Sequence, residues 1–151
     1  MKNLSLSLVA FLVVIILGIL FGLSMSGISE PFLKDLNVGD HIFQVEIADT
    51  LVKQGHGLAK RNSLEENHGM LFVFLDEQIR GFWMKGMKFP LDLIWIKDNK
   101  IIGFNENIQP VWIGDPSVYY SPSPVNLVLE VSAGTVQKLG LKTGDSVLLE
   151  N

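Results

Sequence analysis

The sequence contains no cysteine, and this absence excludes several kinds of site and scaffold. Disulfide-stabilised folds, cysteine nucleophiles, zinc–thiolate centres and iron–sulfur clusters all need thiols. Positive charge is also limited, because 12 Lys and Arg stand against 16 Asp and Glu and give a formal net charge of −4. A phosphate backbone is bound by an excess of cations, so we expect no nucleic-acid partner.

The motifs of common hydrolases are missing as well. The three histidines, His41, His56 and His68, lack the i, i+4 spacing of a helical zinc motif. No Gly-x-Ser-x-Gly elbow is found either. The sequence therefore gives no reason to expect a cofactor, and a binding domain is favoured over an enzyme.

An apolar run without any charge spans residues 4–23 and follows Lys2. At about 1.5 Å per residue, a helix over this run spans roughly 30 Å, the thickness of the hydrocarbon core of a bilayer. The positively charged flank of such a helix stays in the cytoplasm. We therefore expect a single-pass anchor in the cytoplasmic membrane within residues 1–29, with the remaining chain outside.

A cleaved signal peptide is the alternative, with cleavage after Ser26 and a secreted product. The apolar run exceeds the roughly 7–15 residues of a signal core, which favours the anchor. Both alternatives export the same domain. Residues 30–41 mix proline, glycine and charges and are expected to form a tether, so the folded domain is expected over residues 42–151.

The exported part is long enough for one hydrophobic core, and its apolar patterning is mostly that of strands. Strands are expected at residues 43–47, 70–75, 91–96, 100–104, 125–131 and 146–149. Short helices are expected at residues 51–58, capped by Asp49 or Thr50, and at 135–139, ended by Gly140. The predicted fold class is α+β, mainly β: a compact barrel-like or strongly curved sheet with two short helices, preceded by one transmembrane helix.

Many short segments match one family in order and spacing, and together they cover nearly all of residues 43–149. They are VEIADT (45–50), GL (57–58) with Arg61, SL (63–64), GMLF (69–72), FWMK (82–85), PLD (90–92), Ser121, VLE (128–130), Gly134, Gly140 and GD (144–145). On these segments the chain resembles the domain of unknown function family 192 (DUF192). The resemblance implies a small, mainly β fold, often exported or membrane-anchored, and it implies no established activity.

Two positions depart from the family pattern. The family has Gly-Leu-Met-x-Arg where this chain has Ala59 in place of Met, and it has Asn-Thr where this chain has Gly86 and Met87. Any polar contact that the Asn or Thr makes in the family is therefore not expected here.

Charged residues embedded in apolar strands point to a polar site. Asp92 and Glu130 interrupt apolar strands, and a buried carboxylate must be paired or have its pKa raised. We expect them to form a cleft with Arg61, Lys85 and Ser121 that binds a small polar ligand or a cell-envelope partner. A purely structural network of the same groups is the competing interpretation.

Two further functions stay open. An envelope hydrolase would use Asp92 or Glu130 as general acid or base. A Cu(I)-binding module would use Met84, Met87 and His68, since thioether and imidazole groups suit Cu(I).

Overall fold

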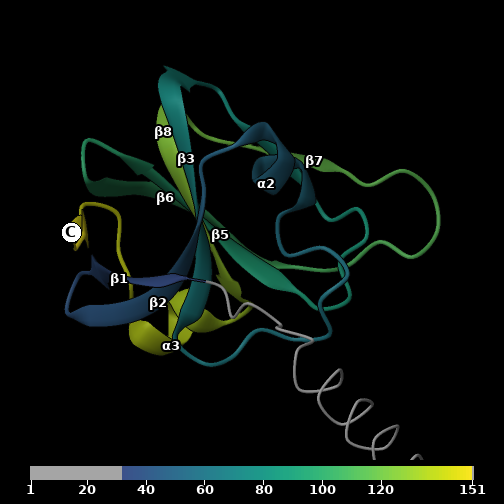
Figure 1. The fold of residues 1–151 in the computed structure, drawn as a ribbon, viewed down its shortest axis with the longest axis horizontal. Helices are drawn as coiled ribbons and strands as arrows, with labels where there is room; N and C mark the ends of the chain where they lie inside the picture. The colour runs from purple at the N-terminus through teal and green to yellow at the C-terminus, as the bar shows by residue number, and fades with distance from the viewer. Residues whose placement is uncertain (1–31, 151) are drawn as a thin grey trace, which may run out of the picture. The chain divides into compact units, whose positions relative to one another are not determined.

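Strands are the main regular structure in residues 32–150, the part of the chain that the computed structural model describes (Figure 1). The elements follow in this order: β1 (Leu33–Val38), β2 (His41–Ala48), α2 (Leu51–His56), β3 (His68–Gln78), β4 (Gly81–Trp83), β5 (Leu91–Lys97), β6 (Lys100–Ile108), β7 (Val118–Tyr120), β8 (Val125–Ser132), α3 (Thr135–Leu139) and β9 (Val147–Leu149). The expected mainly β domain with two short helices is confirmed.

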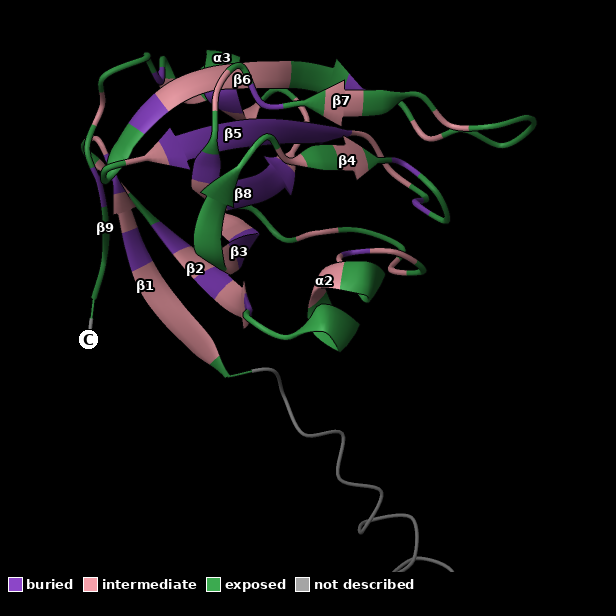
Figure 2. Ribbon diagram, turned by 90° about the horizontal axis from the view of Figure 1, so that it is seen from above, coloured by how far each residue is buried: buried purple, intermediate pink, exposed green. Residues whose placement is uncertain are grey.

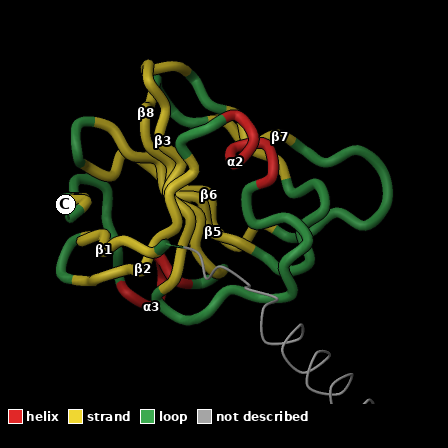
Figure 3. The backbone as a smooth tube through the Cα atoms, viewed as in Figure 1, coloured by secondary structure: helices red, strands yellow, loops and turns green. Residues whose placement is uncertain are grey.

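Seven strands form one curled sheet in the order β6-β5-β8-β3-β2-β1-β9. All neighbours are antiparallel except β2 and β3, which run parallel. Backbone hydrogen bonds join the two ends of this order: the amide of Ile101 donates to Asp145 at 3.0 Å, and that of Gly144 donates to Ile101 at 2.8 Å. The turn before β9 therefore bridges to the start of β6 and curls the sheet into a half-barrel (Figure 3).

A two-residue turn joins β5 and β6 into a hairpin. Asp98 and Asn99 have φ angles of 49° and 56°. Two-residue hairpin turns of type I′ need positive φ at both central positions, and Asn and Asp tolerate it better than most residues. Asp145 likewise shapes its turn, because its Oδ2 accepts a hydrogen bond from the amide of Lys142 at 2.7 Å.

Each face of the curled sheet carries its own hydrophobic cluster. The inner cluster contains Ile101 of β6 and Val147 of β9, from the two ends of the strand order, so it lies inside the curl. The outer cluster contains Met70, Phe72 and Trp95 on the opposite face of β3 and β5. The strands between the two clusters are buried on both faces, as the burial colours of β5 and β8 show (Figure 2).

A second layer covers the outer face. It consists of α2, the loops around it and the two-stranded sheet of β4 and β7. Phe82 of β4 stands edge-on between Phe72 and Trp95, with ring centroids 4.8 and 5.7 Å away. Edge-to-face contacts of this kind hold the small sheet against the large one.

The sequence led us to expect a tether over residues 30–41, but the structure has strand β1 from Leu33 to Val38. β1 pairs with β2 along its whole length and with β9 at its end. Leu36 and Val38 are buried in the inner cluster. Polar Asp35 and Asn37 alternate with them and Lys34 precedes them, so this pattern showed little sign of a strand that is buried on one face.

The expected anchor over residues 4–23 lies outside the described residues. Within residues 32–150, no helix is long and apolar enough to cross a membrane.

Candidate functional site

The two predicted acids lie on opposite faces of the curled sheet. Residues that are opposite each other on neighbouring strands share a face. Asp92 is paired with Val131 of the inner cluster, whereas Glu130 is paired with Leu93 and Met70 of the outer cluster. The strand layer therefore separates the two carboxyl groups, and the structure does not form the single cleft expected from the sequence.

Asp92 has a structural role. Its side chain is fully buried, and both oxygens accept backbone hydrogen bonds: Oδ1 from Asn107 at 2.7 Å and Oδ2 from Val136 at 3.0 Å. The second bond satisfies a free amide in the first turn of α3, whose own N-cap residue, Gly134, has no side chain to do so. The first bond holds the end of β6, where Asn107 has a positive φ of 51°.

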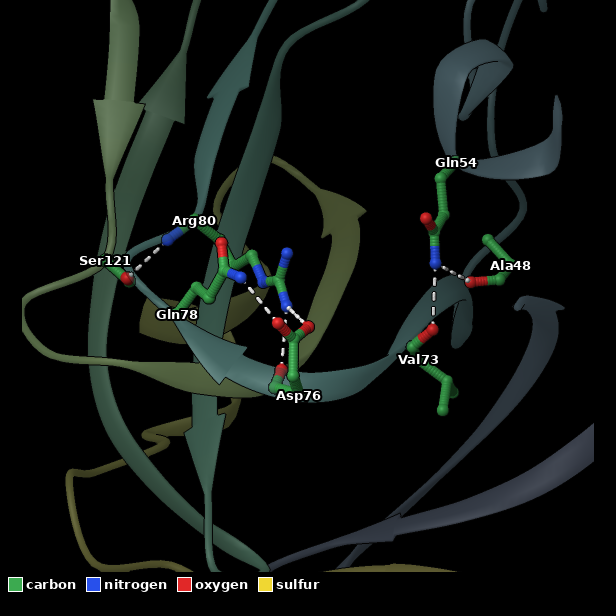
Figure 4. Close-up of polar contacts among 7 residues, drawn as sticks. All are labelled: Ala48, Gln54, Val73, Asp76, Gln78, Arg80 and Ser121. Atoms are coloured by element: carbon green, nitrogen blue, oxygen red, sulfur yellow. Dashed lines mark hydrogen bonds and ion pairs between the residues drawn. The ribbon is translucent and has the colours of Figure 1, made fainter. Parts of the chain in front are cut away.

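Ser121 is also structural. Its Oγ accepts a hydrogen bond from the amide of Arg80 at 3.0 Å, and its own amide donates to the carbonyl of Arg80 at 2.9 Å (Figure 4). The Arg80 guanidinium lies 4.0 Å above the ring of Phe74 and donates to Asp76. Ser121 therefore fastens the segment after β7 to the segment before β4.

Arg61 is occupied by a neighbour that the sequence did not single out. Its guanidinium forms a two-pronged pair with the carboxylate of Glu46 on β2, with Nη2 2.8 Å from Oε2. This pair raises the pKa of Arg61. Glu46 and Glu130 lie in one row across β2, β3 and β8, with Met70 between them. Arg61 thus neutralises Glu46 and acts on Glu130 only from a distance.

A cavity of about 320 Å³ opens between the second layer and the outer face of the sheet. Of the five predicted site residues, it brings together Lys85 and Glu130. Its walls are mainly apolar and aromatic. The lining residues are Leu51, Gln54, Gly55, His56, Gly57, Leu58, Ala59, Phe72, Phe74, Gly81, Phe82, Trp83, Lys85, Met87 and Glu130.

Glu130 is the buried polar group of this cavity. Only 6 % of the residue is exposed, and its Oε2 has no hydrogen-bond partner in the described part of the chain. Burial raises the pKa of Glu130 to about 8, and the charge of Arg61 opposes this rise. Because Arg61 already balances Glu46, burial prevails and the carboxyl is mostly protonated at neutral pH. A neutral carboxyl can both donate and accept a hydrogen bond.

The wall formed by α2 depends on two residues. The side-chain amide of Gln54 donates to the carbonyls of Ala48 and Val73, at 3.3 and 2.8 Å, where β2 and β3 separate (Figure 4). Gly57 ends the helix at φ 49° and ψ −139°, a conformation that other residues avoid. A Cβ at Gly57 would lie 3.3 Å from Phe72 and 3.7 Å from Oε2 of Glu130.

Thr50 caps the start of α2, as one of the two predicted caps, by accepting a hydrogen bond from the amide of Lys53. The aromatic walls were not predicted as site residues. Phe72, Phe82 and Trp83 lie in segments that match the family, but an apolar residue in a strand gives no signal that separates a cavity wall from a core position.

The structure does not bring together the three residues of the candidate Cu(I) site. Met84 and Met87 are buried in the outer cluster, and Met87 lines the Glu130 cavity. His68 lines a separate cavity between residues 64–68 and the segment of α3. No cluster of three His, Asp or Glu side chains that could hold a metal is found among the described residues.

Two solved structures have a fold similar to that of this domain. A protein of unknown function from Novosphingobium aromaticivorans is 29 % identical, with a TM-score of 0.74 over 81 % of this chain and 89 % of that one. A “putative transcription regulator” from Sinorhizobium meliloti is 31 % identical, with a TM-score of 0.74 over 82 % and 98 %. No curated protein matches.

The family model of DUF192, an uncharacterised family, matches residues 34–149. This range includes every strand that lines or supports the cavity, from β2 to β8. Since the match covers most of the chain, the protein belongs to the DUF192 family.

Proposed function

We propose that this domain binds a small, largely apolar molecule in the Glu130 cavity, and that the Glu130 carboxyl fixes the ligand by a hydrogen bond. The predicted exported location, with an anchor in residues 4–23, makes a molecule of the cell envelope or its surroundings the expected ligand. The ligand expected from the sequence was polar, but the walls of the cavity are mainly aromatic and aliphatic. A ligand with an apolar body and one polar group fits this composition.

The observation that carries the proposal is the unpartnered Oε2 of Glu130. A buried polar atom without a partner costs stability, so such atoms are rare in folded proteins unless a site uses them. Here the Glu130 side chain lines a cavity large enough for a small molecule. A ligand group that bonds to it recovers the lost interaction.

A hydrolase is a weaker proposal. A carboxyl that is protonated near neutral pH suits a general acid. The two acids considered from the sequence lie on opposite faces of the sheet, and no second acidic side chain lines the cavity in residues 32–150. A regulator that binds DNA is also disfavoured, because the net charge is −4.

The test is a thermal-shift and calorimetric screen of the full chain against small aromatic compounds, each with and without one hydroxyl or amide group. We expect Glu130→Leu to bind the hydrogen-bonding compounds about 10-fold more weakly than wild type, because the partner of their polar group is gone. Glu106→Gln, a change at an exposed carboxylate on β6, serves as the control and should bind normally.

Failure of every compound to bind at millimolar concentration would contradict the proposal. Equal binding by wild type and Glu130→Leu would also contradict it, since Glu130 would then play no part.

A further inference from the structure

We infer that the ligand has three parts: a neutral hydroxyl or amide group that meets Glu130, a flat apolar body, and an anionic group that meets Lys85 at the mouth of the cavity. This inference rests on the proposed function and names the chemical class of the ligand.

The inner end of the cavity favours a neutral group. Glu130 is buried beside Gly57 and Phe72, so a charged ligand group placed there would lose its hydration. A cation would also meet the positive field of Arg61, which already acts on Glu130. A hydroxyl or amide can exchange a hydrogen bond with the carboxyl at no such cost.

The walls favour a flat apolar body. Phe72 and Phe82 meet edge to face at 4.8 Å, and Phe74 and Trp83 complete the aromatic lining. Trp83 is 55 % exposed although it lines the cavity, so part of its ring is available to a ligand. Aromatic side chains in these arrangements pack well against another ring.

The mouth favours an anion. The exposed charged or titratable side chains along the cavity are Lys85 and His56, and no exposed acid lines it among the described residues. Lys85 makes no ion pair with any residue in the range 32–150, so its ammonium group is available. A carboxylate beside it would remain partly hydrated, which keeps the cost of binding low.

Four probe compounds separate these features: 4-hydroxyphenylacetate, phenylacetate without the hydroxyl, 2-(4-hydroxyphenyl)ethanol without charge, and tyramine with a positive charge. In calorimetric titrations of the full chain, we expect 4-hydroxyphenylacetate to bind most tightly. Loss of the hydroxyl should weaken binding about 10-fold. Replacing the carboxylate by the amine should weaken it by at least about 3-fold.

Two variants assign each preference to a residue. Lys85→Met should remove the preference for the carboxylate and keep that for the hydroxyl, while Glu130→Leu should do the reverse. Lys100→Met, at an exposed lysine at the start of β6, is the matched control and should keep both preferences. Melting curves of each variant establish that it is folded.

The outcomes distinguish this inference from the proposed function. Tightest binding by tyramine, or an unchanged carboxylate preference in Lys85→Met, would overturn the inference and leave the cavity a binding site. If none of the four probes binds but another compound of the screen does, the inference fails and the proposed function stands; if no compound binds at all, both fail.

Discussion

Glu130 makes the domain less stable as pH rises from acidic to neutral values. Its pKa is about 8 in the folded protein and near 4.5 when the side chain is in water. Between these values the unfolded chain loses the proton while the folded chain keeps it. Stability therefore falls as pH rises through this window, and the contribution of Glu130 is constant below it, where both states are protonated.

Glu130→Gln tests this account, because glutamine resembles the protonated acid and does not titrate. Relative to wild type, we expect the variant to gain free energy of unfolding as pH rises from 5 to 8, on the order of 1 kcal/mol per pH unit. Urea unfolding at each pH measures the difference. Parallel pH profiles for the two proteins would refute the raised pKa.

Asp92, unlike Glu130, should stabilise the fold, so replacing it should lower the free energy of unfolding. Asp92→Asn keeps the shape but offers one acceptor oxygen to two backbone amides, those of Asn107 and Val136. We expect a loss of about 2–3 kcal/mol in the free energy of unfolding, since one buried donor is left unpaired. Asp115→Asn, a change on an exposed loop, is the control. If Asp92→Asn lowered the free energy of unfolding by less than about 0.5 kcal/mol, the structural role of Asp92 would be ruled out.

The sequence showed that both acids are embedded in apolar strands, but not which face each occupies. Alternation places Asp92 with Ile94 and Ile96 on one strand, and it gives no relation to Glu130 on another strand. That relation depends on the pairing of β5 with β8, which brings Asp92 opposite Val131. A shift of one residue would have placed both acids on one face.

At the scale of elements, α2 is a part of the cavity wall that contributes no buried residue of its own. None of its residues is buried, and Leu51 and Val52 are 88 % and 71 % exposed. Its attachment to the sheet includes the Gln54 side chain, which donates to Ala48 and Val73. Short helices without buried residues are marginal on their own, so this anchor matters.

Gln54→Leu should loosen α2 while the sheet stays folded. We expect the amides of Gln54 and Gly57, which bond to Thr50 and Lys53, to exchange hydrogen about 10-fold faster. Amides in the middle of β8 report on global stability and should change much less. Val52→Ala on the same helix is the matched control, and equal exchange in the two variants would show that Gln54 is not the anchor.

The sequence predicted the location of α2 and gave Thr50 as one of two candidate caps, because local signals determine both. It gave no indication of the β4–β7 pair, since two strands of three residues with 34 residues between them carry no periodic signal. That pair supplies Phe82 and Trp83 to the cavity. The site was therefore only partly predictable, because part of its aromatic wall depends on a long-range pairing.

At the scale of the whole molecule, the curled sheet explains why the cavity lies on the outside. The inner cluster fills the space inside the curl, and the bridge between Ile101 and the Gly144–Asp145 turn closes it. The outer face is covered by loops, α2 and one small sheet, which pack less completely. The strand patterns predicted the curved sheet, whereas this incomplete cover follows from loop packing that no local pattern encodes.

The most direct test of the account is the carboxyl resonance of Glu130, followed by ¹³C NMR in the full chain from pH 4 to pH 10. We predict a midpoint near 8, as for the buried carboxyl described above. We also predict that 4-hydroxyphenylacetate moves this resonance at pH 7 in a saturable manner, while the signal of exposed Glu106 stays in place. A midpoint near 4.5, with no response to any of the four probes, would contradict the central claim that Glu130 is the ligand-binding group of this cavity.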